Sequence, residues 1–181
     1  KPAEMPVERI ELADGRYHDE LGGPALEVKG GVAMVRIPAR GLVVYDSSDP
    51  AAKPLVADLF AGEIERAGET SRLAADAGAA MDARGYAAQV TPHEGTVALF
   101  HLDGRRHAIR LAGDRFEVGD RVETKASLLE RVRHRPAEFS PNVLLRPIVQ
   151  ATLFPTICYV AGPNELVYLG QLRAVYAACR V

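Results

Sequence analysis

The sequence predicts an α/β fold in which an inserted α+β module interrupts a core of buried strands and helices. Three observations lead to this prediction. A short, continuous apolar run, GLVVYD at 41–46, is typical of a strand that is buried on both faces. A strand, a tight turn and a helix follow one another over 156–176, as in doubly wound folds. Between these segments, at 50–138, the apolar period changes from helical to alternating and back to helical.

The composition indicates a soluble globular chain with enough apolar residues for a core. The 181 residues are 48% hydrophobic and 25% charged, with a net charge of -2. No basic block predicts binding to nucleic acid or to a membrane surface, and no apolar run approaches the roughly 20 residues of a spanning helix. Because Cys158 and Cys179 lack the spacing of a zinc site, we expect a cytoplasmic protein with reduced thiols.

The first segment of the chain, residues 1–38, is rich in glycine, proline and short alternating runs. VERIEL and VAMVRI are separated by ADG and KGG, which predicts strands joined by turns, with no domain assigned to them. Residues 39–49, which contain the apolar run, are then expected to supply one strand of the core.

The module at 50–138 opens with a helix signal at Asp49 and Pro50. Asp49 supplies an N-cap acceptor, and Pro50 lacks the N–H that would be unpaired in the first turn. Apolar residues recur at helical spacing over 55–64, and a second, alanine-rich helix is predicted from about Thr70 to a stop at Gly85.

A β-meander and a third helix complete this module. The runs AQVTP, VALFHL, HAIRL and RFEVG alternate with period two, and the pair Asp103 and Gly104 predicts a hairpin. Thr124 then caps the short helical run KASLLERV. We interpret residues 50–138 as an insertion between two parts of the core, 39–49 and 139–181.

Polar residues gather in the otherwise apolar stretch 140–172. Arg146 precedes Pro147, which predicts that a helix begins at Pro147. A guanidinium at a helix start can offer a fork of donors to a carboxylate or phosphate, and Gln150 lies one turn along on the same face. The alternative is that Arg146 pairs with a structural carboxylate and that Gln150 caps backbone groups.

A second group of polar residues follows the predicted strand TICYVA. In doubly wound folds, ligands bind outside the carboxyl ends of strands and near helix N-termini. Gly162 allows close backbone approach, and Asn164 can cap the following helix. Three more residues lie on neighbouring faces of its first two turns: Glu165, Tyr168 and Gln171. The alternative is that Asn164 is only a cap and Glu165 only a favourable charge near the helix dipole.

The histidines predict no metal site. His101 and His107 flank the hairpin turn and can pair across it, but no carboxylate or third ligand accompanies them, and packing is the simpler interpretation. The other histidines, His18, His93 and His134, are isolated in polar loops. The sequence also contains no P-loop and no Gly-x-Ser-x-Gly elbow.

The segment FSPNVLLRPIVQATLFPTICYVAGPNELVYLGQLRAVY closely resembles the bacillithiol synthase family, cysteine ligases that add cysteine to glucosaminyl malate. GLVVYDSSDPAAKPL resembles the family's strand with its Asp-Pro helix start. ARGYAAQV and ALFHLDGRRHAIRL resemble the insert that follows. The likeness covers about residues 40–181.

The resemblance implies a partial Rossmann-like core with an inserted α+β connecting domain that contains the β-meander. It also implies kinship with nucleotide-using synthetases, with ATP as the activating cofactor, and with cysteine and glucosaminyl malate as small-molecule substrates. The family forms homodimers through a coiled coil, which is absent from this chain.

Carried over by position, the resemblance implies a pocket at the strand ends. The expected substrate-binding residues are Asn142, Arg146, Gln150, Glu165, Tyr168 and Gln171, and the expected cofactor-binding residues are Gly162 and Asn164. Arg146 is a candidate fork for a substrate carboxylate or phosphate, while Glu165 and Tyr168 are candidates to orient an amine or a sugar hydroxyl. The catalytic base is not assigned.

Several parts of the family pattern are not found in these residues, including its Gly-Gln-Gln segment and its Glu-Asp-His-Asp motif. The chain also begins with lysine and stops at Val181 just after a helical pattern. The leading hypothesis is therefore a fragment of a cysteine ligase that is inactive alone. The alternative is a non-catalytic remnant, or one subunit of a split enzyme that needs a partner chain.

Overall fold

The computed structural model describes four strands within residues 3–37 and then residues 46–154, 156 and 159–181. These residues fall into two compact units, Lys1–Asp46 and Ser47–Val181. In both units, every strand pairing among the described residues is antiparallel. The described part is thus a mixed α/β structure, as predicted.

The first unit contains one four-stranded sheet with the strand order β1-β4-β3-β2. Its strands are β1 (Ala3–Glu8), β2 (Gly15–Tyr17), β3 (Leu26–Lys29) and β4 (Val32–Ile37). The predicted strand VAMVRI forms β4, whereas VERIEL overlaps β1 only at Val7 and Glu8. The predicted core strand at 41–46 lies outside the described residues except for Asp46.

The second unit begins with three helical segments. A 3-10 helix, η1 (Pro50–Val56), starts where the Asp-Pro signal predicted, and Asp49 Oδ1 accepts a 2.9 Å hydrogen bond from the Ala51 N–H. Helices α1 (Ala57–Glu65) and α2 (Glu69–Asp82) follow. Gly68, at φ 84°, takes the left-handed conformation that turns the chain between them.

A five-stranded sheet with the order β8-β7-β6-β5-β9 forms the centre of this unit. The predicted meander supplies β5 (Thr96–Leu102), β6 (Arg106–Ala112), β7 (Arg115–Val118) and β8 (Arg121–Thr124). Asp103 and Gly104 form the predicted hairpin turn, with Gly104 at φ 86°. The last strand, β9 (Phe139–Pro141), pairs with β5. This pairing joins the predicted insertion to the chain beyond 138; the domain boundary there stays a prediction.

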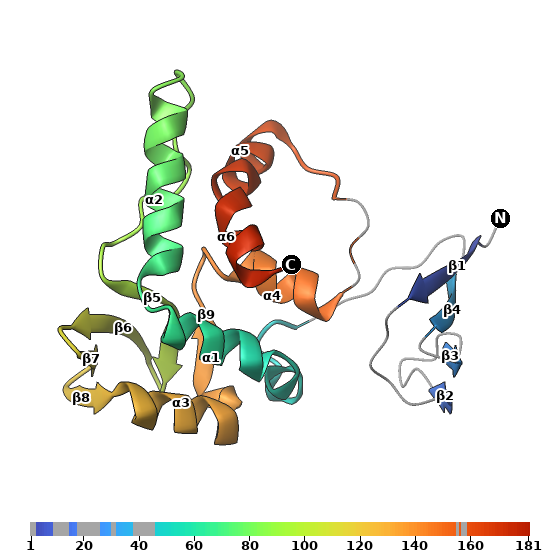
Figure 1. Ribbon diagram of the computed structural model, residues 1–181, viewed down its shortest axis with the longest axis horizontal. Coiled ribbons are helices and arrows are strands. Elements are labelled where there is room, and N and C mark those ends of the chain that lie inside the picture. Colours follow the sequence, from blue (N-terminus) through green and yellow to red (C-terminus); the bar gives the residue numbers. More distant parts are fainter. Residues whose placement is uncertain are drawn as a thin grey trace. The chain divides into compact units, whose positions relative to one another are not determined.

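The remaining helices flank this sheet. Thr124 caps α3 (Lys125–His134) through a 3.2 Å bond from the Ser127 N–H, and the 3-10 helix η2 (Pro136–Glu138) follows. Three helices end the chain, namely α4 (Arg146–Leu153), α5 (Pro163–Gln171) and α6 (Arg173–Cys179). In Figure 1, α2 stands beside α5 and α6, which it contacts.

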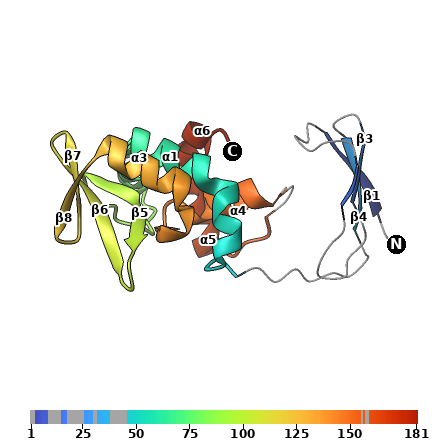
Figure 2. The ribbon, with the colours of Figure 1, turned by 90° about the horizontal axis from the view of Figure 1, so that it is seen from below.

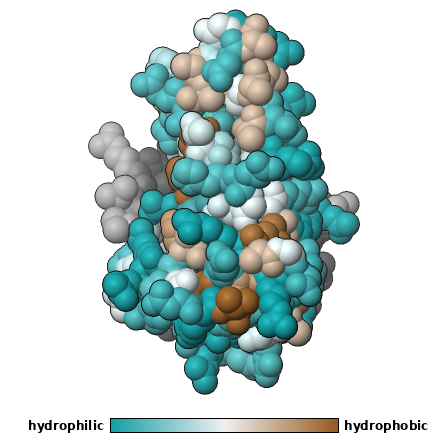
Figure 3. Space-filling view, turned by 90° about the vertical axis from the view of Figure 1, so that its left-hand side faces the viewer, coloured by the Kyte–Doolittle hydropathy of each residue, from teal (hydrophilic) through white to brown (hydrophobic). Residues whose placement is uncertain are grey.

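The core lies between one face of the sheet and the helices α1 and α3, which lie side by side (Figures 1 and 2). The burial pattern of strand β7 agrees with this position of the core. Phe116 and Val118 are buried while Arg115 and Glu117 are exposed, as expected for a strand that is covered on one face. The largest fully buried side chains include Phe60, Ile64, Leu99, Ile109, Phe116, Leu128 and Phe139. The side of α2 and the sheet edge is mostly hydrophilic, with only separate apolar spots (Figure 3).

Two predicted strands do not form in the described residues. AQVTP, at 88–92, is irregular because Val90 pairs its backbone with the side chain of Gln171 and not with a neighbouring strand. Of the predicted strand at 156–161, the described residues 156 and 159–161 are not in a strand. A buried strand exists only as part of a ladder, and the two sheets of the described residues include no strand from this segment.

Among the described residues, the helices are all too short or too polar to span a lipid bilayer.

Candidate functional site

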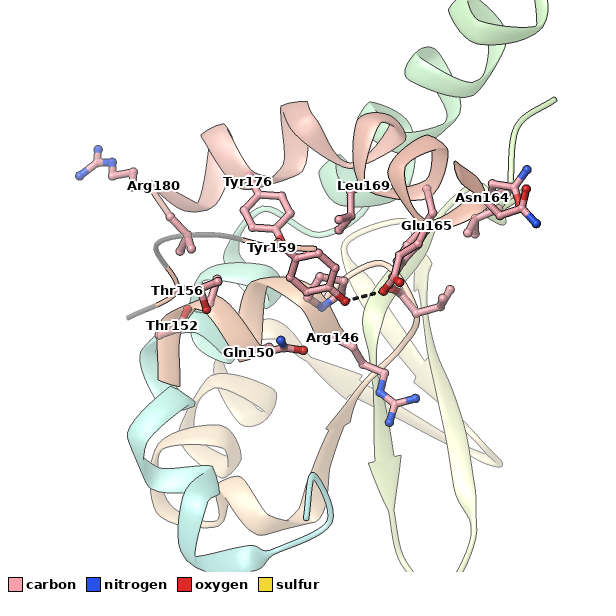
Figure 4. A pocket seen from close by; sticks show the side chains of 17 residues that line it. Arg146, Gln150, Thr152, Thr156, Tyr159, Asn164, Glu165, Leu169, Tyr176 and Arg180 are labelled. Atoms are coloured by element: carbon pink, nitrogen blue, oxygen red, sulfur yellow. Dashed lines mark hydrogen bonds between the residues drawn. The ribbon is translucent and has the colours of Figure 1, made fainter. Parts of the chain in front are cut away.

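A cavity of about 1220 Å³ lies between the helices α4, α5 and α6. It holds five of the eight residues that the sequence predicted for a site: Arg146, Gln150, Asn164, Glu165 and Tyr168. The other lining residues are Gln89, Val90, Val143, Pro147, Ala151, Thr152, Thr156, Tyr159, Leu169, Tyr176, Arg180 and Val181. Figure 4 shows the cavity and its side chains.

Arg146 is the first residue of α4, one position before the predicted start, and its side chain is exposed. Its Nη2 lies 3.3 Å from the hydroxyl of Ser47. Among the described residues it forms no ion pair with a carboxylate, so its fork of donors is directed at solvent and at the cavity rim. Gln150, one turn further, is also exposed and lines the cavity.

Asn142 shapes the turn before α4 and does not line this cavity. Its Oδ1 accepts hydrogen bonds from the N–H groups of Leu144, at 2.9 Å, and Leu145, at 3.4 Å. Its own N–H donates to the Ala98 carbonyl at 2.9 Å, which ties the turn to β5. Asn142 therefore supports the position of Arg146, and it is one of the three predicted residues that do not line this cavity.

The α5 residues approach the cavity from the opposite side. Gly162 is the N-cap in an extended conformation, so Asn164 is the second helical residue and not the predicted cap. Gly162 does not line the cavity, whereas Asn164 does. The correction follows from Pro163, which suits the first helical position and so fixes the start of α5 there.

Tyr159 and Glu165 point toward each other in the cavity (Figure 4), and the Tyr159 hydroxyl donates a hydrogen bond to Glu165 Oε1. This bond, together with burial, raises the pKa of Tyr159. The side chains of Arg146 and Arg180 extend away from this pair. The sequence did not single out Tyr159, because it lies in the apolar run TICYVA, which predicted a strand and not a site.

Tyr168 links α5 to the turn before α4. Its hydroxyl donates a hydrogen bond to the carbonyl oxygen of Val143. Burial, with a smaller effect of the neighbouring Tyr176, raises the pKa of Tyr168 to about 12. Because a neutral phenol is the donor form, this hydroxyl keeps its bond over the physiological pH range.

Gln171 is fully buried and does not face the cavity. Its Oε1 accepts 3.1 Å bonds from the N–H groups of Gln89 and Val90. Its Nε2 donates to the carbonyls of Ala74, at 3.1 Å, and Val90, at 2.7 Å. All four hydrogen-bonding positions of the amide are therefore occupied by backbone groups, and Gln171 holds the loop that forms one wall of the cavity.

The glycine at position 78 makes room for this amide. A Cβ there would lie 2.9 Å from Gln171 Nε2 and 3.2 Å from the Cβ of Ala88. Since Gln171 is fully buried and its amide is held by four backbone hydrogen bonds, a larger residue at position 78 would displace the loop.

The chemistry of the cavity is mixed. Tyrosine rings and aliphatic groups form much of its wall, while Arg146 and Arg180 supply cations and Glu165 a carboxylate. Such a lining suits a small polar molecule that carries an anionic group and hydroxyl or amine groups.

His101 and His107 face each other in the register of β5 and β6, but each has partners of its own. His101 is buried, with Arg121 Nη2 at 3.3 Å from Nδ1 and Arg131 Nη1 at 3.2 Å from Nε2. Burial, reinforced by these two cations, lowers the pKa of His101. His107 Nε2 lies 2.6 Å from Asp103 Oδ1. Within the described residues, no group of three or more potential ligands could hold a metal ion.

Comparison with known proteins points to one family. Residues 33–181 match the family model described as the N-terminal Rossmann-like domain of the bacillithiol biosynthesis protein BshC. Three relatives carry the provisional name cysteine ligase BshC. The Koribacter versatilis protein is 39% identical over 137 residues, which are 75% of this chain and 26% of the relative. The Salinibacter ruber protein is 38% identical over 143 residues, 75% of this chain and 25% of the relative.

The Symbiobacterium thermophilum protein is 36% identical over 176 residues, which are 87% of this chain and 32% of the relative. The chain thus spans about a quarter to a third of the length of these curated relatives.

Proposed function

The chain belongs to the BshC family of bacillithiol biosynthesis, and from this premise we propose that its cavity is part of the substrate site of a ligase. The reaction is the formation of an amide bond between cysteine and glucosaminyl malate. The family name supports the reaction class, and the mixed cationic, acidic and hydroxyl lining of the cavity supports the substrate class.

The observation that carries this proposal is that a guanidinium without a carboxylate partner among the described residues, Arg146, lines the same cavity as an acid on the opposite helix, Glu165. Arg146 lines the cavity without a carboxylate partner among the described residues. A substrate carboxylate can therefore accept hydrogen bonds from its guanidinium N–H groups. Glu165, oriented by the Tyr159 hydroxyl, can accept a hydrogen bond from an amine or a sugar hydroxyl. Both substrates present these groups, since each contains carboxylate together with amine or hydroxyl.

Amide formation from a carboxylate requires that the carboxylate be activated, and we propose ATP as the source of this activation. A cationic group beside the reacting carboxylate stabilises the negative charge that develops in the transition state. Arg146 is the candidate for that role, and Asn164 and the backbone at Gly162 are the candidates for cofactor contacts.

We further propose that catalysis needs the rest of the protein, which contributes the other side of the site and a homodimer interface. The share of the relatives that this chain covers supports this view. A cytoplasmic setting, where thiols stay reduced, suits the thiol product.

The proposal is tested on the protein encoded by the complete reading frame. Incubation with glucosaminyl malate, cysteine and ATP is expected to give the coupled thiol, identified by its mass. Arg146→Ala is expected to lower kcat/KM by at least about tenfold, because it removes a charge-assisted contact to a substrate carboxylate. Its Tm is expected to stay close to that of the wild type, because Arg146 is exposed.

Arg105→Ala is the matched control, because Arg105 is an exposed arginine in the hairpin turn away from the cavity. A folded complete protein that forms no product would refute the ligase assignment. A large loss of Tm in Arg146→Ala, with kcat/KM unchanged in the molecules that stay folded, would instead make Arg146 a structural residue.

A further inference from the structure

A second cavity, of about 460 Å³, adjoins the first one on the face of the sheet that α1 and α3 leave uncovered. The two cavities share Val90, Val143 and Arg146. The second cavity is lined by β5, β6, the loop at 90–93 and the turn at 141–146. We call it the β6 arginine pocket.

Strand β6 contributes Arg106 and Arg110 to this pocket, with Ala108 between them on the same face. Both arginines are exposed. The small side chain of Ala108 leaves a depression between the two long cationic ones, and its partner across the strands is Phe100. The floor of the pocket is therefore apolar, and its rim is cationic.

No carboxylate of the described residues lines the pocket, although acidic residues are as frequent as basic ones in the chain. Six arginines form ion pairs with carboxylates in the described residues: Arg66, Arg72, Arg121, Arg131, Arg133 and Arg135. Among those same residues, Arg106, Arg110 and Arg146 form none. Glu117 faces Arg110 in the register with β7 and lines an adjoining cavity together with Arg106 and Arg110, but it forms no ion pair with either arginine among the described residues. His93 adds a further donor to the rim.

We propose that the β6 arginine pocket binds an oligophosphate anion. The Cα atoms of Arg106 and Arg110 lie about 13 Å apart on one strand, four residues at about 3.3 Å each. A single phosphate is too small to contact the guanidinium groups of Arg106, Arg110 and Arg146 together when these side chains are extended. A chain of two or three phosphates, in contrast, offers anionic oxygens along its length. The inference stands on this charge distribution and does not depend on the proposed ligase reaction.

The test is a calorimetric titration of the 181-residue chain with sodium tripolyphosphate, at an ionic strength of about 0.15 M to suppress unspecific attraction. Arg106→Gln and Arg110→Gln are each expected to weaken binding by about tenfold, because each removes a charge-assisted hydrogen bond. Arg105→Gln is the matched control. It has the same change in charge at the neighbouring position, and its side chain lies outside the pocket, so its affinity is expected to change by less than about twofold.

Further arms define the ligand class. Orthophosphate is expected to bind at least about tenfold more weakly than tripolyphosphate, because it reaches fewer of the arginines. ATP that binds more tightly than tripolyphosphate would assign the pocket to a nucleotide, and equal affinities would assign it to the oligophosphate part alone.

A second measurement does not depend on the folding of the variants. Tripolyphosphate is expected to protect Arg106, Arg110 and Arg146 of the wild-type chain from modification by phenylglyoxal, while Arg105 stays reactive, as mapped by peptide mass. The proposal is overturned if millimolar tripolyphosphate does not bind, if Arg105→Gln weakens binding as much as Arg106→Gln, or if orthophosphate binds equally well.

Discussion

The sheet side and the cavity side of residues 47–181 are held together in different ways. On the sheet side, β5–β8 pair in sequence order and the helices α1 and α3 bury large apolar side chains against them. On the cavity side, irregular segments are fixed by single polar side chains: Asn142, Tyr168 and Gln171. Regular pairing and apolar burial therefore build the frame, whereas individual hydrogen bonds place the walls of the cavity.

The largest expected effect comes from breaking the apolar frame. Phe116→Ala removes a side chain that is 1% exposed between β7 and the core, and we expect a loss of about 3–5 kcal/mol in the free energy of unfolding. Urea titration followed by circular dichroism measures it. Val122→Ala, at a position that is 59% exposed, is the control and is expected to change the free energy by less than about 0.5 kcal/mol. Equal effects of the two variants would contradict the assigned core.

An intermediate effect is expected from the amide that holds the cavity wall. Gln171→Ala leaves four backbone groups without their partner, and we expect a loss of about 2–3 kcal/mol in the free energy of unfolding. It is also expected to speed amide hydrogen exchange at Gln89 and Val90 more than in β5. Gln89→Ala, a change of an exposed glutamine side chain, is the control. Uniform exchange changes across the chain would show that the loop is not held locally.

The smallest expected effect depends on pH and concerns a polar group inside the packed region. Glu63 is fully buried, and its carboxylate accepts from the Thr70 hydroxyl at 2.5 Å and the Ala98 N–H at 2.8 Å. Burial raises the pKa of Glu63 above its usual 4.5, even though these two bonds act in the opposite direction. The folded state thus binds this proton more tightly than the unfolded state does.

The stabilisation linked to this proton is fully present below the unfolded pKa, and it is lost as the pH rises through the folded pKa. In the wild type, Glu63 causes the free energy of unfolding to decrease as the pH rises above about 4.5. We therefore expect a smaller decrease in the Glu63→Gln variant. Urea titrations across the acidic range measure the slope, with Glu94→Gln, an exposed acid, as the control. An unchanged slope in Glu63→Gln would contradict the raised pKa.

The regular elements were predictable because their signals are local. The Asp49 and Thr124 caps, the helical stripe of α1 and the Asp103–Gly104 hairpin are each encoded within a few residues. The family likeness of the stretch 139–176 was equally readable, and the match of residues 33–181 to the BshC family model confirms it.

The roles within the predicted site were less predictable. The sequence predicted the same substrate-binding role for Asn142, Gln171, Arg146 and Glu165. In the fold, the side chains of the first two are directed at backbone groups, and only the latter two line the cavity. Tyr159 and Arg180 carried no pattern of their own. The arginines of β6, which form no ion pair within the described part of the chain, become a group only because the turn at 141–146 lies beside them.

The sequence by itself determined the α/β class, the order of most elements and the family, because periodicity, caps and turns act over short range and a long motif is specific. Only the tertiary structure decided which polar side chains are used up by backbone groups and which stay available. That distinction depends on contacts between residues some eighty to one hundred positions apart, such as Gln171 with Ala74 and Val90, and no local pattern encodes them.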